Sequence, residues 1–483
     1  MNYLFFPCSI LLLSIFTISH ADTFDNELAS LLEGFDTNQA AMTDEEDEED
    51  AELEALLNEF EKTTTLESDV ASSFQATQKR KWDLVSHGSF SGSYNFQQDE
   101  PVENETDYRL SRLKYKLIPE FKLEISNSWN TFISANIFYD YAYFINGEKN
   151  YRQEVIDTYQ SEIEFREAYI QGTITNYLDI KVGRQIVVWG KSDSIRVVDV
   201  LNPLDFREPG MMDIEDLRLP VGMIKTDFYY ANWNLSAIVI PEIRFNKTPP
   251  LGSDFYLGQG DPIAENIPNS IVNPEFAVSL NSTFSGWDLS FHAAQVYDDI
   301  PYVKMNNSTP ATLNHSRINL AGGATNFVLG NWLFKSETAI IDGLAFSNSN
   351  NLLRRLDVMF GFDYTGIQDI VYSVEAVNRR LLNYNIALEE LPDLTLRDEE
   401  QIALRYTGNF FREKLQLVAL LSIFGTSIDD GAFYRGSAEY EIFDAFSIMV
   451  GGIVYQAQKN NANSIPSKIA KNDRVFFDLR YSF

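Results

Sequence analysis

The sequence predicts an all-β fold: a transmembrane antiparallel β-barrel of about 18 strands, with 16 as the alternative count. A mostly disordered acidic arm with two short amphipathic helices precedes it. Three observations predict the barrel: alternating apolar and polar residues, connections that are alternately short and long, and tryptophans that share one edge. The domain boundaries that follow are residues 1–21, a signal peptide; 22–80, the arm; and 82–483, the barrel.

The alternation is clearest at the C-terminus. One face of this strand carries the apolar side chains of Val475, Phe477, Leu479, Tyr481 and Phe483, and the other carries Phe476, Asp478, Arg480 and Ser482. The same pattern sets Trp287 and Phe291 against Asp288, Ser290 and His292, and sets Phe360 and Phe362 against Asp357, Gly361 and Asp363. Successive residues of a strand point to opposite faces, so the pattern indicates lipid on one side and a wet lumen on the other.

The connections between the predicted strands alternate in length. Short ones lie at 126–128, 231–232, 285–286 and 330–331, and long ones at 190–220, 244–274, 298–318 and 381–400. Trp129, Trp233, Trp287 and Trp332 each begin a strand directly after a short turn. They should therefore share one rim, where an indole prefers the membrane–water interface. A β-sandwich gives no reason for either regularity.

Composition excludes several classes of function. The chain has 483 residues and a formal net charge of −32, with 70 acidic and 38 basic side chains, which argues against nucleic-acid binding. Its single cysteine, Cys8, lies in the apolar stretch Leu4–Ile18 ahead of the small-x-small site Ser19-His20-Ala21. That stretch reads as a cleaved signal peptide, so disulfides, thiolate metal sites and cysteine nucleophiles are not expected in the mature protein.

The arm contains one motif twice, on either side of the acidic run 44–50. Both copies read Leu-x-x-Leu-Leu-x-x-Phe: Leu28, Leu31, Leu32 and Phe35, then Leu53, Leu56, Leu57 and Phe60. This spacing places four apolar side chains on one face of a helix, which is the pattern of a helix that binds in a partner's groove. Two alternatives are helices that pack on each other or on the barrel, and binding to a lipid surface. Duplication across an acidic spacer favours bivalent docking.

The connection 190–220 is rich in Arg and Asp, and loops of this length are usually functional or disordered. We predict that it folds into or over the lumen as a constriction or gate, held by Arg–carboxylate pairs. The alternative is an outer loop whose ion pairs hold only its own shape. The candidate gating residues are Trp189, Asp193, Arg196, Asp199, Asn202, Pro203, Asp205 and Arg218.

No catalytic, cofactor-binding or metal-binding residues are predicted, and we do not expect an enzyme. His87, His292 and His315 are the histidines outside the signal peptide. His292 follows Ser290 on one strand face, but positions two apart lie about 6.5–7 Å from each other, too far for a direct bond unless the side chains lean together. There is no Gly-rich phosphate loop and no spacing typical of a metal site.

Two resemblances extend these predictions. The last strand, with Leu479, Tyr481 and Phe483, resembles the signature by which outer-membrane proteins are recognised by the barrel-assembly machinery. The phrase Gly183-Arg-Gln-Ile-Val-Val-Trp-Gly190, then Asp193, Arg196, Asp199, Asn202-Pro203, Asp205 and Arg218-Leu-Pro220, with Pro241-Glu-Ile-Arg-Phe-Asn246 further on, resembles a proteobacterial outer-membrane barrel family of unknown function. This family is grouped with alginate-export-like barrels. The resemblance implies an outer-membrane location and work beside a resistance-nodulation-division-type exporter and a periplasmic carrier.

The function predicted from the sequence is passage or hand-over of a solute, possibly apolar, across the bacterial outer membrane. The arm would lie in the periplasm and dock a periplasmic or inner-membrane partner. The alternative is a non-transporting anchor, scaffold or binding protein. Expected partners are outer-membrane lipid and lipopolysaccharide, the barrel-assembly machinery, and the exporter or carrier. The substrate, the direction of transport and the oligomeric state are not predicted.

Overall fold

The computed structural model describes residues 81–98, 108–258, 263–270, 272–304, 311–459, 461 and 464–483. The chain divides into two units, Met1–Lys79 and Arg80–Phe483, and every described residue belongs to the second. The predicted signal peptide and the arm with both Leu-x-x-Leu-Leu-x-x-Phe motifs therefore lie outside the described residues.

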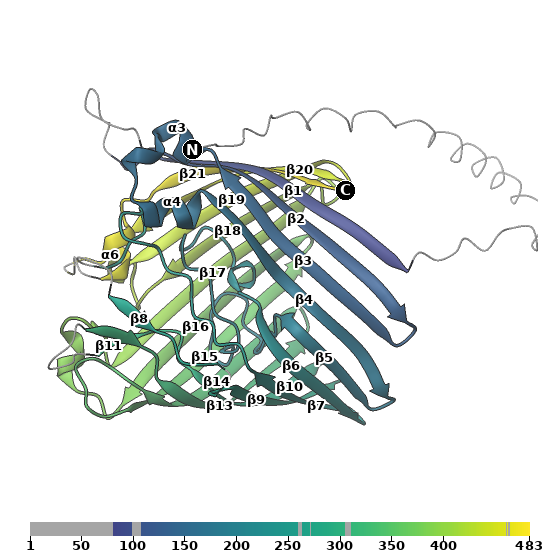
Figure 1. The fold of residues 1–483 in the computed structure, drawn as a ribbon. Helices are drawn as coiled ribbons and strands as arrows, with labels where there is room; N and C mark the ends of the chain where they lie inside the picture. Colours follow the sequence, from purple (N-terminus) through teal and green to yellow (C-terminus); the bar gives the residue numbers. More distant parts are fainter. Residues whose placement is uncertain are drawn as a thin grey trace, which may run out of the picture. The chain divides into compact units, whose positions relative to one another are not determined.

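The second unit is a closed barrel of 18 antiparallel strands, which confirms the predicted fold (Figure 1). The wall consists of β1 Trp82–Asn95, β2 Leu110–Ser126, β3 Trp129–Asp140, β4 Ser161–Thr175, β5 Leu178–Gln185, β6 Val221–Tyr230, β7 Trp233–Ile240, β9 Glu275–Phe284, β10 Trp287–Tyr297, β13 Arg317–Leu329, β14 Trp332–Leu344, β15 Leu353–Ile367, β16 Ile370–Leu382, β17 Asp398–Phe410, β18 Leu415–Ile423, β19 Ala432–Phe443, β20 Phe446–Gln456 and β21 Arg474–Ser482. Each strand pairs with its sequence neighbours, and β1 pairs with β21 from His87↔Ser482 to Asn95↔Arg474. This last pairing leaves no free sheet edge.

Short turns lie at one end of the barrel and long connections at the other, as predicted. The long connections carry the remaining elements: α3 Ala142–Asn146, η1 Glu148–Asn150, α4 Gln153–Tyr159, α5 Ile214–Leu217, η2 Ile386–Glu389, η3 Ile428–Asp430 and α6 Ile465–Ile469, and a small sheet of β8 Ala264–Asn266, β11 Tyr302–Lys304 and β12 Thr312–Asn314. Within the described ranges, no helix has both the length and the apolar character that a membrane span requires.

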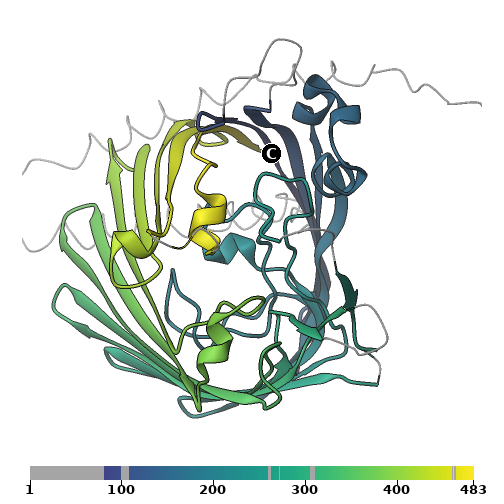
Figure 2. The ribbon, with the colours of Figure 1, turned by 90° about the vertical axis from the view of Figure 1, so that its left-hand side faces the viewer.

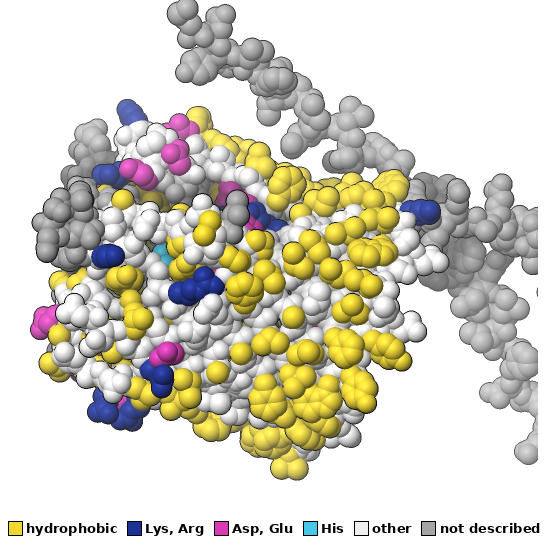
Figure 3. All heavy atoms as spheres, turned by 60° about the horizontal axis from the view of Figure 1, so that its bottom comes forward, with side chains coloured by type: hydrophobic (Ala, Val, Ile, Leu, Met, Phe, Trp, Pro, Cys, Tyr) yellow, Lys and Arg dark blue, Asp and Glu magenta, His cyan; other side chains and the backbone are white. Residues whose placement is uncertain are grey.

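The two faces of the wall differ as the alternation predicts. On β15, Phe360 points outward and is 66% exposed, whereas its neighbour Met359 points inward and is fully buried. Figure 3 shows apolar side chains over the outer wall, while most of the visible charged side chains gather at the end with the long connections. Trp129, Trp233, Trp287 and Trp332 each begin a strand after a short turn, so they share one rim. Trp129 also covers Gly172 on β4, where an added Cβ would meet the indole at 2.3 Å.

The alternation of the sequence predicts strands over 129–144 and 177–189, and both extend four residues beyond the observed ends at Asp140 and Gln185. The strand expected over 129–144 ends at Asp140, because its carboxylate accepts the backbone N–H groups of Leu113 and Ala142 and starts the turn into α3. The strand expected over 177–189 ends at Gln185, because the backbone N–H of Val187 donates to the side chain of Asn202 at 2.8 Å instead of to a neighbouring strand.

Candidate functional site

The connection between β5 and β6, residues 186–220, enters the barrel; we call it the lumen loop. Figure 2, seen from the end with the long connections, shows this teal segment inside the ring of strands. Asn202, fully buried, closes the base of the loop: its amide donates to the backbone oxygens of Leu219 at 2.9 Å and Gln185 at 3.3 Å. Pro203 follows, and its carbonyl accepts the N–H of Leu219 at 2.8 Å. The loop therefore leaves and rejoins the wall at one place.

The first part of the lumen loop packs against an apolar inner wall. Val187, Trp189, Ile195, Val197, Val198 and Leu201 form one buried cluster with inward residues of β6, β7, β9, β10 and β13–β17, among them Ile238, Ile240, Val296, Ile341, Met359 and Val377. The contact is close at Gly322, where an added Cβ would meet a methyl group of Val198 at 2.8 Å. The wet lumen expected from the sequence is thus replaced on this side by a dry core, which we call the apolar half.

Two buried carboxylates of the wall hold this part of the loop. Glu337 on β14 accepts the backbone N–H groups of Lys191 and Ser192. Glu375 on β16 accepts the N–H groups of Asp193 at 2.8 Å and Ser194 at 2.9 Å, and the hydroxyl of Ser192 at 2.6 Å. Both side chains are almost completely buried. Consecutive N–H groups that converge on a carboxylate form charge-assisted hydrogen bonds, so this attachment is strong and directional.

The second part of the loop is attached to the opposite wall by ion pairs. Asp213 binds Arg405 of β17 at 3.1 Å and also Arg435 of β19, and Glu208 binds Arg112 of β2. Arg207 binds Glu162 of β4 at 3.0 Å.

The loop carboxylates of these pairs are held in the ionised form. Burial alone would raise the pKa of Glu208, but Arg112 and other cations outweigh it and lower this pKa to about 2. For Asp213, burial again acts upward, but Arg435 and Arg405 lower the pKa below its ordinary value. Both anchors are therefore ionic at neutral pH.

The predicted gating residues lie in this loop, but in separate places. Asp199 is buried and binds Arg218 at 2.9 Å and Arg196 at 3.3 Å, which joins three of them in the centre. Asp193 binds Lys335 of β14, and Asp205 pairs with Arg207. The indole of Trp189 lies on the ring of His292, with 4.6 Å between centroids. A gating role for these residues stays a prediction.

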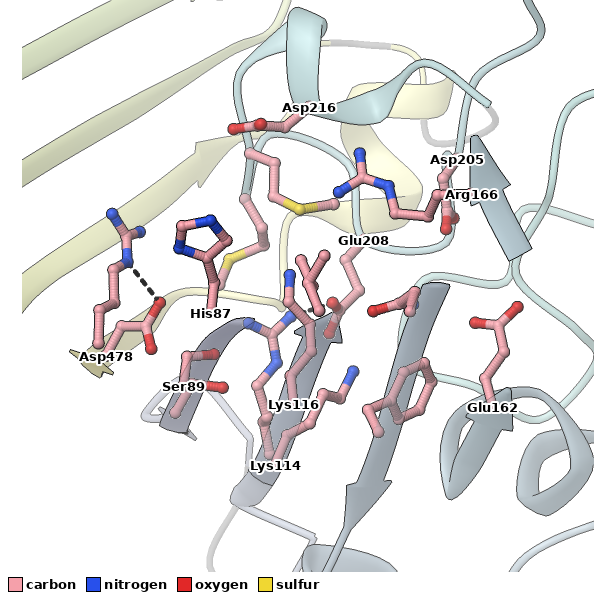
Figure 4. Close-up of a pocket in the computed structure, with 18 of the residues that line it drawn as sticks. His87, Ser89, Lys114, Lys116, Glu162, Arg166, Asp205, Glu208, Asp216 and Asp478 are labelled. Carbon is pink, nitrogen blue, oxygen red and sulfur yellow. Dashed lines mark hydrogen bonds and ion pairs between the residues drawn. The ribbon is translucent and has the colours of Figure 1, made fainter. Parts of the chain in front are cut away.

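A cavity of about 440 Å³ lies in the lumen, between the second part of the loop and strands β1–β4, β20 and β21 (Figure 4). We call this side the charged half. Its lining includes eight Lys and Arg residues and six carboxylates: Arg112, Lys114, Lys116, Arg166, Arg207, Arg218, Lys247 and Arg480, with Glu162, Glu164, Asp205, Glu208, Asp216 and Asp478. Ion pairs engage five of the cations. The lining residues Lys114, Lys116 and Arg166 have no carboxylate of the described residues within ion-pairing distance; we call them the cation cluster.

The Ser290–His292 pair differs from the sequence argument. The two side chains lean together, which is the condition that the sequence argument set for a direct bond, and Ser290 Oγ lies 3.0 Å from His292 Nε2. The other ring nitrogen, Nδ1, is buried without a hydrogen-bond partner. Asp288, the carboxyl next along the face, binds Lys191 instead. The pair thus lacks the carboxylate that orients the histidine of a hydrolytic triad. The described residues also contain no group of three or more potential metal-binding side chains.

Sequence reasoning missed the wall residues that hold the loop, and the cation cluster. The usable signal was present in the alternation, because Lys335, Glu337 and Glu375 occupy inward positions of strands that were predicted correctly. A buried carboxylate of the wall needs hydrogen-bond donors, and the long loop is the segment that could supply them. Which loop residue meets which wall residue depends on chain segments more than 140 residues apart, so strand periodicity carries no information about it.

These features define a class: a closed outer-membrane-type β-barrel with a long loop folded into its lumen. The structure is similar to OccAB2 of Acinetobacter baumannii, at 9% identity and a TM-score of 0.50, covering 83% of this chain and 98% of that one. It is also similar to OccAB4 of the same organism, at 8% identity and a TM-score of 0.50, covering 85% and 100%. Identities this low establish the shared fold alone.

The chain belongs to the family described as "Protein of unknown function (DUF1302)", which it matches over residues 55–401. The matched range contains the whole lumen loop and, from the arm, Leu56, Leu57 and Phe60 of the second motif. This agrees with the family resemblance noted from residues 183–246. A search of curated proteins gave no match.

Proposed function

We propose that the barrel passes a small polar solute across the outer membrane through the charged half of its lumen, with the lumen loop as the constriction. One observation carries the proposal: the loop fills one half of the lumen, is attached to opposite walls, and leaves a cavity of about 440 Å³ lined by charged side chains. Charged groups at a constriction select what passes. The lining favours a polar solute, which changes the earlier expectation that the solute is possibly apolar.

Conductance and vesicle-swelling measurements test the proposal. The refolded full-length protein, inserted into planar lipid bilayers, should give discrete conductance steps, and vesicles that contain it should swell in small polar solutes. A protein that is folded, as judged by its faster electrophoretic migration before heating, yet conducts nothing and admits no solute would contradict the proposal. That outcome would favour the alternative of a non-transporting anchor or scaffold.

We further propose that the arm binds a periplasmic or inner-membrane partner, an exporter component or a soluble carrier, through the two Leu-x-x-Leu-Leu-x-x-Phe motifs. The support is the repeat itself: one apolar helical face occurs twice, separated by an acidic spacer. Two weak sites on one segment bind a partner with two grooves more tightly than either site alone.

A further inference from the structure

The cation cluster occupies one side of the cavity, and none of its three side chains forms an ion pair with a described carboxylate. Lys114 and Lys116 are two positions apart on the lumen face of β2, about 6.5–7 Å from each other. Arg166 extends from β4, and the ammonium of Lys116 lies in the electrostatic field of both Arg166 and Lys114. Figure 4 shows the three side chains around one hollow. Three like charges, all on partly buried side chains, thus lie close together.

The carboxylates nearby do not neutralise the cluster. Glu208 is engaged by Arg112, Asp205 by Arg207, Glu162 and Glu164 by Lys247, and Asp478 by Arg480. Asp216, the remaining carboxylate of the described lining, forms no ion pair and its side chain is exposed. Among the lining residues, two positive charges are left in excess once Asp216 is set against the cluster. Outside the lining, the buried Asp140 is the cross-strand neighbour of Lys114, and setting it against the cluster as well still leaves one positive charge in excess. Cations held together without partners are costly, and a bound anion removes that cost.

The same cavity also has an apolar surface. Ile118, Phe138, Met211, Met212, Met449 and Phe476 line it. Phe138 is buried, and the ammonium of Lys114 lies 4.3 Å from the centre of its ring. Methionine side chains are flexible and polarisable, so they adapt to apolar groups of different shape. The cavity therefore combines an anion-binding side with an apolar side.

We propose that this cavity binds small organic carboxylates: Lys114, Lys116 and Arg166 bind the carboxylate, and the apolar part of the molecule contacts Phe138 and the methionines. The inference rests on the proposed passage function, since the bound molecule would be the solute that passes. The chemical class of the ligand follows from the combination of cations and apolar side chains in one cavity. An inorganic anion would use the cations alone, and a neutral molecule would use the apolar surface alone.

The test measures binding separately from passage. Isothermal titration of the refolded full-length protein in detergent uses benzoate, benzyl alcohol and sulfate as probes. We expect benzoate to bind, and to bind at least about tenfold more tightly than the other two. The triple variant K114Q/K116Q/R166Q should weaken benzoate binding by about tenfold or more. Lys122→Gln is the matched control: Lys122 lies on the lumen face of the same strand but outside the cavity lining, and its loss should leave affinity unchanged.

Each result decides one question. Equal affinity for benzoate and sulfate, equal affinity for benzoate and benzyl alcohol, or an unchanged triple variant would overturn the carboxylate site even if the barrel conducts. Normal benzoate binding without any conductance would contradict the proposed passage function but support the carboxylate-binding site. If the triple variant does not fold, Lys116→Gln alone is the substitute, and it should weaken benzoate binding while Lys122→Gln does not.

Discussion

The carboxylate of Glu375 accepts the backbone N–H of Asp193 at 2.8 Å, and this bond joins the wall of the barrel to a loop 182 residues earlier in the chain. The same carboxylate holds the two serines on either side of Asp193. A side chain of the wall thus determines the path of a backbone segment in the lumen. Under the proposed passage function, the width of the opening would therefore depend on residues that need not touch the solute.

The first prediction concerns this attachment. Glu375→Ala removes three hydrogen bonds to a buried charged group, each worth roughly 1.5–3 kcal/mol. We expect the segment 191–194 to leave the wall, and single-channel recordings to show a larger or noisier conductance. Glu441→Ala is the control, because Glu441 is a lumen-facing carboxylate of β19 outside this set. Identical recordings from the two variants would show that the attachment does not control the opening.

A second prediction uses two glycines with similar, positive φ angles. Gly190 has φ +89°, and an added Cβ would meet the carboxylate of Glu337 at 2.5 Å, a group already bound to the loop backbone. Gly286 has φ +85°, but nothing lies within 4 Å of an added Cβ. Both alanine substitutions carry the strain of a left-handed residue, about 1–2 kcal/mol. Only Gly190→Ala should also displace the loop, seen as changed conductance and a lower unfolding temperature than Gly286→Ala. Equal effects would contradict close packing at Gly190.

The third prediction is a pH dependence of stability. The pKa of Glu208 is lowered in the folded protein from 4.5 to about 2 by its cationic neighbours. A pKa that is lower in the folded state means that the ion pair contributes fully above pH 4.5 and loses its contribution as the pH falls towards 2. Denaturant unfolding at pH 6, 4 and 3 should show this loss. Glu208→Gln should reduce it, whereas Asp216→Asn, which removes an exposed carboxylate of the same loop, should not.

A fourth prediction tests which face of the wall meets lipid. Val450 on β20 points outward and is 53% exposed, and Ser437 on β19 faces the lumen beside Gly451. Val450→Arg should destabilise the barrel in phospholipid vesicles by about 2–4 kcal/mol, because arginine near the middle of the bilayer is costly. Ser437→Arg, at nearly the same depth, should cost less. Equal costs would mean that the outward face is not in contact with lipid.

The sequence predicted the wall well for a physical reason. Strand periodicity is local, so the outward Phe360 and the inward Asp357 can be assigned from their neighbours alone. The strand ends were predicted wrongly where a side chain accepts a backbone N–H group that would otherwise bond to a neighbouring strand. Asp140 and Asn202 accept such groups, and two strands therefore end earlier than predicted.

The interior of the barrel could be predicted only in part. Arg/Asp richness indicated that residues 190–220 form ion pairs, and the structure contains them. The partners are mostly on the wall, however: Asp213 and Arg435 are 222 residues apart, and no local pattern relates them. The apolar half has the same origin, since Ile238 and Val377 become core residues only because the loop covers them.

The last prediction concerns the arm, whose proposed partner-binding face is defined by Phe35 and Phe60. A photo-crosslinker at either position should join the protein in cells to one periplasmic or inner-membrane protein. Phe35→Ala or Phe60→Ala should each reduce capture, because one remaining site binds without the gain in affinity of bivalent binding. The double variant should abolish capture, because both apolar contacts are then lost. Phe74→Ala, an arm phenylalanine outside both motifs, should capture normally. Normal capture by the double variant would eliminate the docking proposal, and adducts only to the barrel itself would make the arm a ligand of its own chain.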